Sequence, residues 1–156
     1  MRRGILLAKR LREVFIDGRW IANTNYQHQV KQLDWEQATQ KVGNLNTVAL
    51  LTYHINYYLA GILSAIETGK LEIRDKYSFD MPEITNQKDW DILWYNLILN
   101  AEKFAKHVEA MEDDELERPF IAEEYGSYLR NIEGVIEHSY YHLGQITLIG
   151  KMVNPL

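Results

Sequence analysis

The sequence predicts an all-α protein, namely an antiparallel four-helix bundle with one long crossover connection. Four long stretches repeat apolar residues at the spacing of one helix face, and the three prolines fall outside them. A chain of 156 residues is most simply one domain, here 1–156. It is long enough to bury a stable core without a disulfide or a structural metal. It contains no cysteine, so neither disulfides nor thiolate ligands contribute to the fold.

The first long helix is expected over residues 3–15, where apolar residues share one face. These are Leu7, Leu11, Val14 and Phe15. Two short helices should follow, over 26–32 and 35–41. Asp34 can cap the second of these, and Gln37 stands three positions later, as a capping box requires.

The second long helix is expected to begin after Asn46 or Thr47 and to end near Gly69, a residue suited to a helix C-terminus. The third should begin at 86–91, where Asn86 and two aspartates favour a helix start, and should end at Met111. The segment 111–115 is acidic but lacks the alternating ligands and glycine of an EF-hand loop, and we interpret it as a solvated turn.

The connection over residues 70–87 is longer than a helix–helix turn needs. It could lie over a pocket, or it could simply cross from one end of the bundle to the other. Of these alternatives we expect the plain crossover.

The last long helix, over 125–153, carries His138 and His142. Residues four apart lie one turn above each other on the same helix face, so the two imidazoles can share a metal ion. Such a pair occurs by chance often enough that a third ligand is needed. His54 is the candidate, because it lies in the middle of the apolar stripe of the second long helix, where a bare imidazole needs a partner.

The motif His-x-x-x-His-x-Gly-Gln-Ile on a last helix, with one His midway along an earlier helix, resembles the DinB-like superfamily of four-helix metalloproteins. The resemblance covers nearly the whole chain and implies that His54, His138 and His142 bind a divalent metal. Members often have Arg or Lys at the position of Leu143, so a possible anion contact is missing here. We expect Gly144 and Gln145 to serve helix packing, with the amide facing outward or toward the site.

Three imidazoles without a fourth protein ligand are typical of an open site rather than a closed structural one. Zinc or nickel is the first expectation for the metal, and iron or manganese is also compatible. Ser139 stands where a zincin has its glutamate base, so no catalytic residue is identified. His28 and His107 have no partner at ligand spacing and should be surface residues.

We expect the open position to face a pocket lined by Tyr58, Gln145 and residues of the first helix. Tyr58 and Gln145 are therefore the candidates for binding a cofactor or substrate, although packing would explain either residue equally well. Asn131 and Tyr141 fall near the same face as the two neighbouring histidines, and for Tyr141 we favour packing.

The resemblance favours a metal-dependent transferase that acts with a small-thiol cosubstrate. A metal-dependent hydrolase and a non-catalytic, stress-associated metal-binding domain are the alternatives. A homodimer is expected for two reasons. The side chains of four Trp, ten Tyr and four Phe present more aromatic surface than the core of one narrow bundle readily buries, and the resemblance implies dimers. The net charge of −5 argues against nucleic acid as a partner. No stretch approaches the length of a membrane span, and we expect a cytoplasmic protein.

Overall fold

The computed structural model describes residues 2–155, and over this part of the chain the protein is all-helical, as predicted. Residues 2–155 form seven α-helices, four of them long, and two short 3-10 helices, with no β-strand among them. In chain order these helices are α1 (Arg3–Phe15), α2 (Tyr26–Val30), α3 (Trp35–Thr39), α4 (Val48–Thr68), η1 (Asp75–Tyr77), α5 (Gln87–Ala110), α6 (Asp113–Leu116), η2 (Glu123–Tyr125) and α7 (Tyr128–Val153).

The ends of the long helices are fixed by the capping residues that the sequence predicts. Thr47 and Asn86 accept hydrogen bonds from backbone N–H groups in the first turns of α4 and α5. Gly69 closes α4 in the left-handed conformation, with φ of 73°. Asp34 and Gln37 form the expected capping box of α3. The short helices α2 and α3 end about two residues earlier than expected.

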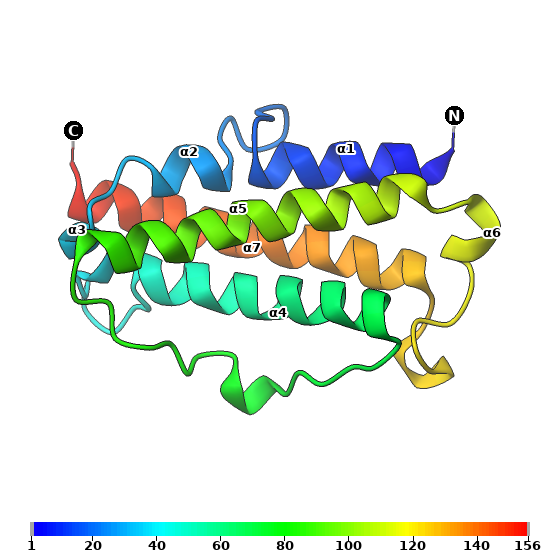
Figure 1. The fold of residues 1–156 in the computed structure, drawn as a ribbon. Helices are drawn as coiled ribbons and strands as arrows, with labels where there is room; N and C mark the ends of the chain where they lie inside the picture. The colour runs from blue at the N-terminus through cyan, green and yellow to red at the C-terminus, as the bar shows by residue number, and fades with distance from the viewer. Residues whose placement is uncertain (1, 156) are drawn as a thin grey trace.

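The four long helices lie side by side (Figure 1). α1 packs on α5, α5 on α4, α4 on α7, and α7 on α1. α4 and α5 run in the same direction, opposite to α1 and α7, because the connection over 69–86 returns along the length of the molecule (Figure 1). His107 Nε2 lies 3.3 Å from a Glu67 carboxylate oxygen, and this contact joins the late turns of the two parallel helices.

The core runs between the four long helices. It includes two aromatic side chains, Trp90 and Tyr26, whose polar atoms form hydrogen bonds to backbone carbonyls. The fully buried Trp90 donates from its indole N–H to the Leu33 carbonyl at 2.9 Å. The fully buried Tyr26 donates to the Ser139 carbonyl at 2.7 Å. The hydrogen bond from Tyr26 holds α7 at a point between His138 and His142. Each of the two bonds pairs a polar group that would be costly to bury without a partner.

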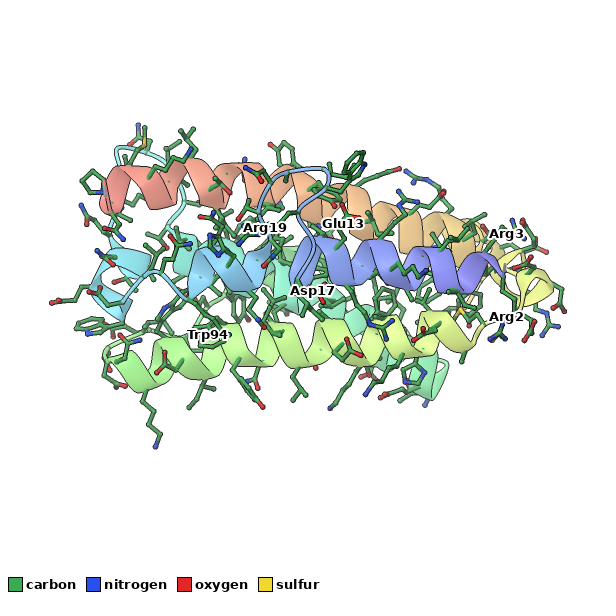
Figure 2. All side chains as sticks on the ribbon, turned by 90° about the horizontal axis from the view of Figure 1, so that it is seen from above. Arg2, Arg3, Glu13, Asp17, Arg19 and Trp94 are labelled. Atoms are coloured by element: carbon green, nitrogen blue, oxygen red, sulfur yellow. The ribbon has the colours of Figure 1, made fainter. Side chains whose placement is uncertain are left out.

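The acidic segment before Pro119 is not the solvated turn that the sequence suggested. It forms the one-turn helix α6, which buries Leu116 in the core while Asp113 and Asp114 stay exposed and Glu115 is half-buried. Arg2 and Arg3 lie at the same end of the molecule as α6 (Figure 2), and they bond to Glu112, Asp113 and Glu117. The turn becomes helical because Leu116 has an apolar site to occupy, which the local sequence does not reveal.

α4 is the one helix within residues 2–155 that is long and apolar enough to cross a membrane by length and composition. The expectation that no stretch approaches such a length is therefore wrong for this helix. Core helices that never meet a membrane satisfy the same criterion. Many of its apolar residues face the neighbouring helices, including Leu51, Ile55 and Leu59.

Candidate metal centre

The three histidines singled out from the sequence come together between α4 and α7. His54 Nε2 lies 3.4 Å from His138 Nε2, and His142 Nε2 lies 3.0 Å from the same atom. One ligand atom from each of the three residues falls within 4.8 Å of the others. Within residues 2–155 this is the one cluster of histidine and acidic side chains tight enough to hold an ion.

The spacing of these nitrogens fits a shared metal ion. Imidazole nitrogens bound to zinc lie about 2.0–2.1 Å from the metal, which places two tetrahedral ligands about 3.4 Å apart. The two measured separations, 3.0 and 3.4 Å, are close to that value. Without a metal, the same separations fit a hydrogen bond that His138 Nε2–H donates to a neighbouring Nε2, so the centre can hold either a metal ion or this proton.

Hydrogen bonds at the opposite ring atoms leave Nε2 free in two of the three histidines. His54 Nδ1 lies 3.3 Å from the Ser78 carbonyl oxygen. His142 Nδ1 lies 2.6 Å from Gln145 Oε1. Carbonyl and amide oxygens only accept, so each Nδ1 carries the hydrogen and each Nε2 presents a lone pair to the centre. This is the usual outer arrangement around metal-binding histidines.

The position of Gln145 therefore suits a role in orienting the His142 ring, since its amide oxygen accepts the hydrogen bond from His142 Nδ1. Replacing it by Leu should remove the acceptor and weaken metal binding about 10- to 100-fold, as the loss of such partners typically does. Gln145→Glu, which keeps an oxygen acceptor, should retain most of the affinity. Competition of each variant with a fluorescent zinc chelator measures the difference. Equal affinities in the two variants would mean that the amide does not orient the ring.

The site is partly shielded from solvent, which favours neutral imidazoles. Burial, reinforced by the neighbouring His142 and His54, lowers the pKa of His138 to about 4. Burial also lowers the pKa of His54 and of His142 from the ordinary value of 6.5. Neutral imidazole is the form that binds metal, so the metal-free site is held ready for ligation at neutral pH.

Metal binding should consequently persist to lower pH than free imidazole would allow. An ordinary histidine would lose metal below about pH 6, but here protons compete only as pH falls well below that value. The affinity for zinc should fall less below pH 6.5 than that of free imidazole, and it should be lost as the pH approaches the His138 pKa of about 4. The metal-free protein should lose stability as the pH falls from about 6.5 toward about 4, because its unfolded histidines take up protons near 6.5 and its folded ones do not. An affinity that halves already near pH 6.5 would contradict the lowered pKa values.

The connection between α4 and α5 is not the plain crossover that we expected. Its segment from η1 to Phe79 lies against the histidines. Phe79 stacks on the His54 ring, with centroids 4.1 Å apart, and Ser78 supplies the carbonyl described above. Asp75 accepts a 2.8 Å hydrogen bond from the Tyr58 hydroxyl. The connection thus covers one side of the candidate metal centre.

Two residues of α4, Tyr57 and Gly61, hold this covering segment in place. The Tyr57 hydroxyl donates to the Arg74 carbonyl and accepts from the Arg74 N–H, each at 2.9 Å. Gly61 lets Ile73 approach the helix closely, because a Cβ at Gly61 would lie 2.1 Å from an Ile73 methyl carbon. These contacts join residues distant in the chain, so local sequence patterns gave no sign of them.

A cleft of about 460 Å³ opens beside the centre, within the range of small-molecule sites. It lies between α4 and α7, and the residues that line it are His54, Tyr58, Ile62, Arg130, Asn131, Gly134, Val135 and His138. Tyr58 is at the cleft as expected, but neither Gln145 nor any residue of α1 lines it. Gln145 borders a separate hollow beside residues 44–46, because its amide turns toward His142.

Comparisons of the chain with protein-family models, with curated proteins and with solved structures give no match. The chemistry of the site must therefore be argued from its own residues.

The other residues considered from the sequence lie away from the ligand atoms. His28 and His107 are exposed, as predicted, and His107 pairs with Glu67. Tyr141 is 65 % exposed and meets only the edge of the His142 ring. Leu143 is buried in the apolar core. Gly144 is exposed, with open space at its Cβ position, so the predicted packing role of this glycine is wrong.

The sequence reasoning missed Arg130, the one permanently charged residue at the cleft. Asn131 lies seven residues before His138, so it falls on the same face of α7. Arg130 lies eight residues before, which turns it about 80° away. Its long side chain nevertheless reaches the cleft and Glu137, whose carboxylate lies 3.0 Å from the guanidinium.

Proposed function

We propose that this protein binds one divalent metal ion through His54, His138 and His142, with at least one coordination position left for a small molecule. The observation that carries this proposal is the convergence of three Nε2 atoms whose rings are held by hydrogen bonds behind them. Zinc or nickel suits this ligand set first, and iron or manganese is compatible with it. The hydrogen bonds at Nδ1 also support a defined site rather than a chance cluster.

We further propose that the chain is a DinB-like four-helix bundle with a long crossover. Support comes from the order of the four long helices and from one histidine on the second long helix with two on the last. The two pairs of helices that run in opposite directions fit an antiparallel bundle in which α4 and α5 are parallel neighbours.

The activity that we favour is a metal-dependent transferase with a small-thiol cosubstrate. A divalent metal at three histidines supplies Lewis-acid chemistry and favours the thiolate form of a thiol or the ionised form of a water molecule. Ile62 and Val135 give the cleft apolar walls, and no carboxylate lines it. A substrate that is itself the nucleophile suits such a cleft, because its lining offers no carboxylate to act directly as a general base.

A metal-dependent hydrolase remains the second candidate because of one pair of residues. Tyr58 stands edge-on to both His54 and His138, with ring centroids 5.1 and 5.5 Å away, and donates to Asp75. Asp75 could accept a proton through this tyrosine. A screen of thiols with electrophiles, run beside an ester and amide panel on metal-loaded protein, separates the two candidates. Stoichiometric metal without turnover in either panel would favour the non-catalytic alternative.

Removal of the metal tests whether the site is open. The core is built by apolar faces of all four long helices, so the fold does not depend on the metal. Chelation should therefore abolish any turnover, remove about one equivalent of metal and lower the melting temperature by only a few degrees. Metal analysis, circular dichroism and thermal melts before and after chelation give this result. Outright unfolding of the stripped protein would make the site structural and remove the main support for an enzyme.

A homodimer is also proposed, because large apolar side chains remain exposed. Along α7 these are Tyr141, Leu148 and Met152, which recur at helical spacing. Their burial against a second copy would remove them from water. Light scattering at micromolar concentration tests the proposal, and a monomer there would refute it.

A further inference from the structure

We propose that the cleft beside the histidines selects a small molecule with two ends: one that binds at the three histidines and an anionic one that binds Arg130. This inference rests on the proposed metal site and extends it by naming the class of ligand. A carboxylate on a short apolar linker is the simplest chemistry that satisfies both ends.

The cleft brings the guanidinium of Arg130 and the proposed metal position at the histidines within reach of one small molecule. Arg130 and His138 both line the cleft, and eight residues of helix separate their Cα atoms by about 12 Å. The guanidinium extends along α7 in the direction of His138, since it bonds at 3.0 Å to the carboxylate of Glu137, the residue before His138. A ligand of modest length therefore spans the two.

The surface between the two ends is apolar and open. Ile62 and Val135 provide the walls, and Gly134 lies one turn before His138. A Cβ at Gly134 would meet no atom within 4 Å, so the cleft is free where a larger residue would project. Methylene groups of a linker can occupy this space and leave water.

Arg130 is available to a ligand at small cost. Its present partner is Glu137, and the two side chains are 62 % and 59 % exposed. Ion pairs this exposed contribute little to stability, so an anion that reaches the guanidinium competes easily with the glutamate. Arg130 also lies in the first turn of α7, where the positive end of the helix dipole favours an anion. Asp75, which contacts the cleft residue Tyr58, is already hydrogen-bonded to its hydroxyl.

Binding of matched thiols to the cobalt-loaded protein tests the proposal. We would titrate 6-mercaptohexanoate and the uncharged 6-mercapto-1-hexanol and follow the visible absorption that a thiol gives on cobalt. The acid should bind about tenfold more tightly than the alcohol, since a charge-assisted bond of this kind contributes about 1.5–3 kcal/mol before solvent screening. Arg130→Gln should bring the two affinities together by weakening only the acid, and Glu137→Gln should tighten the acid about two- to threefold.

The outcomes separate this inference from the metal proposal. Equal affinities of acid and alcohol in the unmodified protein, or an Arg130→Gln variant that keeps the preference, would overturn the anion site while leaving the metal site intact. The same holds if neither thiol binds to protein that carries cobalt. If the protein takes up no cobalt, the metal proposal fails, and calorimetry with the acid and Arg130→Gln on metal-free protein still decides the role of the arginine.

Discussion

The double variant His138→Ala, His142→Ala should lose essentially all bound metal while it keeps its helix content. Each imidazole is one of three ligands, and structural zinc sites gain about 10–16 kcal/mol from four. Loss of one ligand should therefore weaken binding at least about a hundredfold, and loss of two should abolish it. Elemental analysis of protein purified from metal-supplemented cultures measures the effect, with far-ultraviolet circular dichroism as the check on folding.

The remaining histidines provide a matched control. His28→Ala, His107→Ala removes the same number of imidazoles from exposed positions away from the cluster, and it should retain a full equivalent of metal. Stoichiometric metal in the His138, His142 variant, or equal loss in both double variants, would refute the assignment.

The second large effect is expected from Gly134→Leu, which should close the cleft without disturbing the metal. Gly134 lines the cleft, and a side chain there points into open space. A helical leucine covers the turn before its own Cα, which here is the stretch toward Arg130. Affinity for 6-mercaptohexanoate should fall about tenfold or more, as overpacking typically costs about 1–3 kcal/mol. Leucine favours helix over glycine, so the variant should melt no lower than the parent.

Gly144→Leu is the control for this change. Gly144 lies in the same helix, also has open space at its Cβ, and is exposed outside the cleft. This variant should gain the same helix propensity while it binds metal and thiol normally. If both variants bind 6-mercaptohexanoate like the parent, the ligand does not occupy the cleft, and a route to the histidines from another side would have to be sought.

The helices and the three histidines were accessible from the sequence for the same reason. Apolar periodicity and capping residues act within a few turns, so the bounds of α1, α4 and α5 followed closely from local patterns. The pair His138 and His142 is set by helix geometry alone. His54 could be added because an imidazole in the middle of an apolar stripe needs a partner, and in the structure it has two histidine neighbours.

What surrounds the histidines was decided by tertiary structure. Phe79 and Ser78 reach His54 because the connection between α4 and α5 folds back over the site, guided by Tyr57 and Gly61. These contacts join residues 12 to 25 positions apart through an irregular segment, where no period relates one side chain to the next. The sequence by itself therefore determined the helices and the three candidate ligands, since the helices, the His138 and His142 pair and the position of His54 in an apolar stripe all follow from patterns within single helices. Packing between distant segments, which only the folded chain brings together, decided the rest. It placed the connection over the site, oriented the histidine rings and formed the cleft with Arg130.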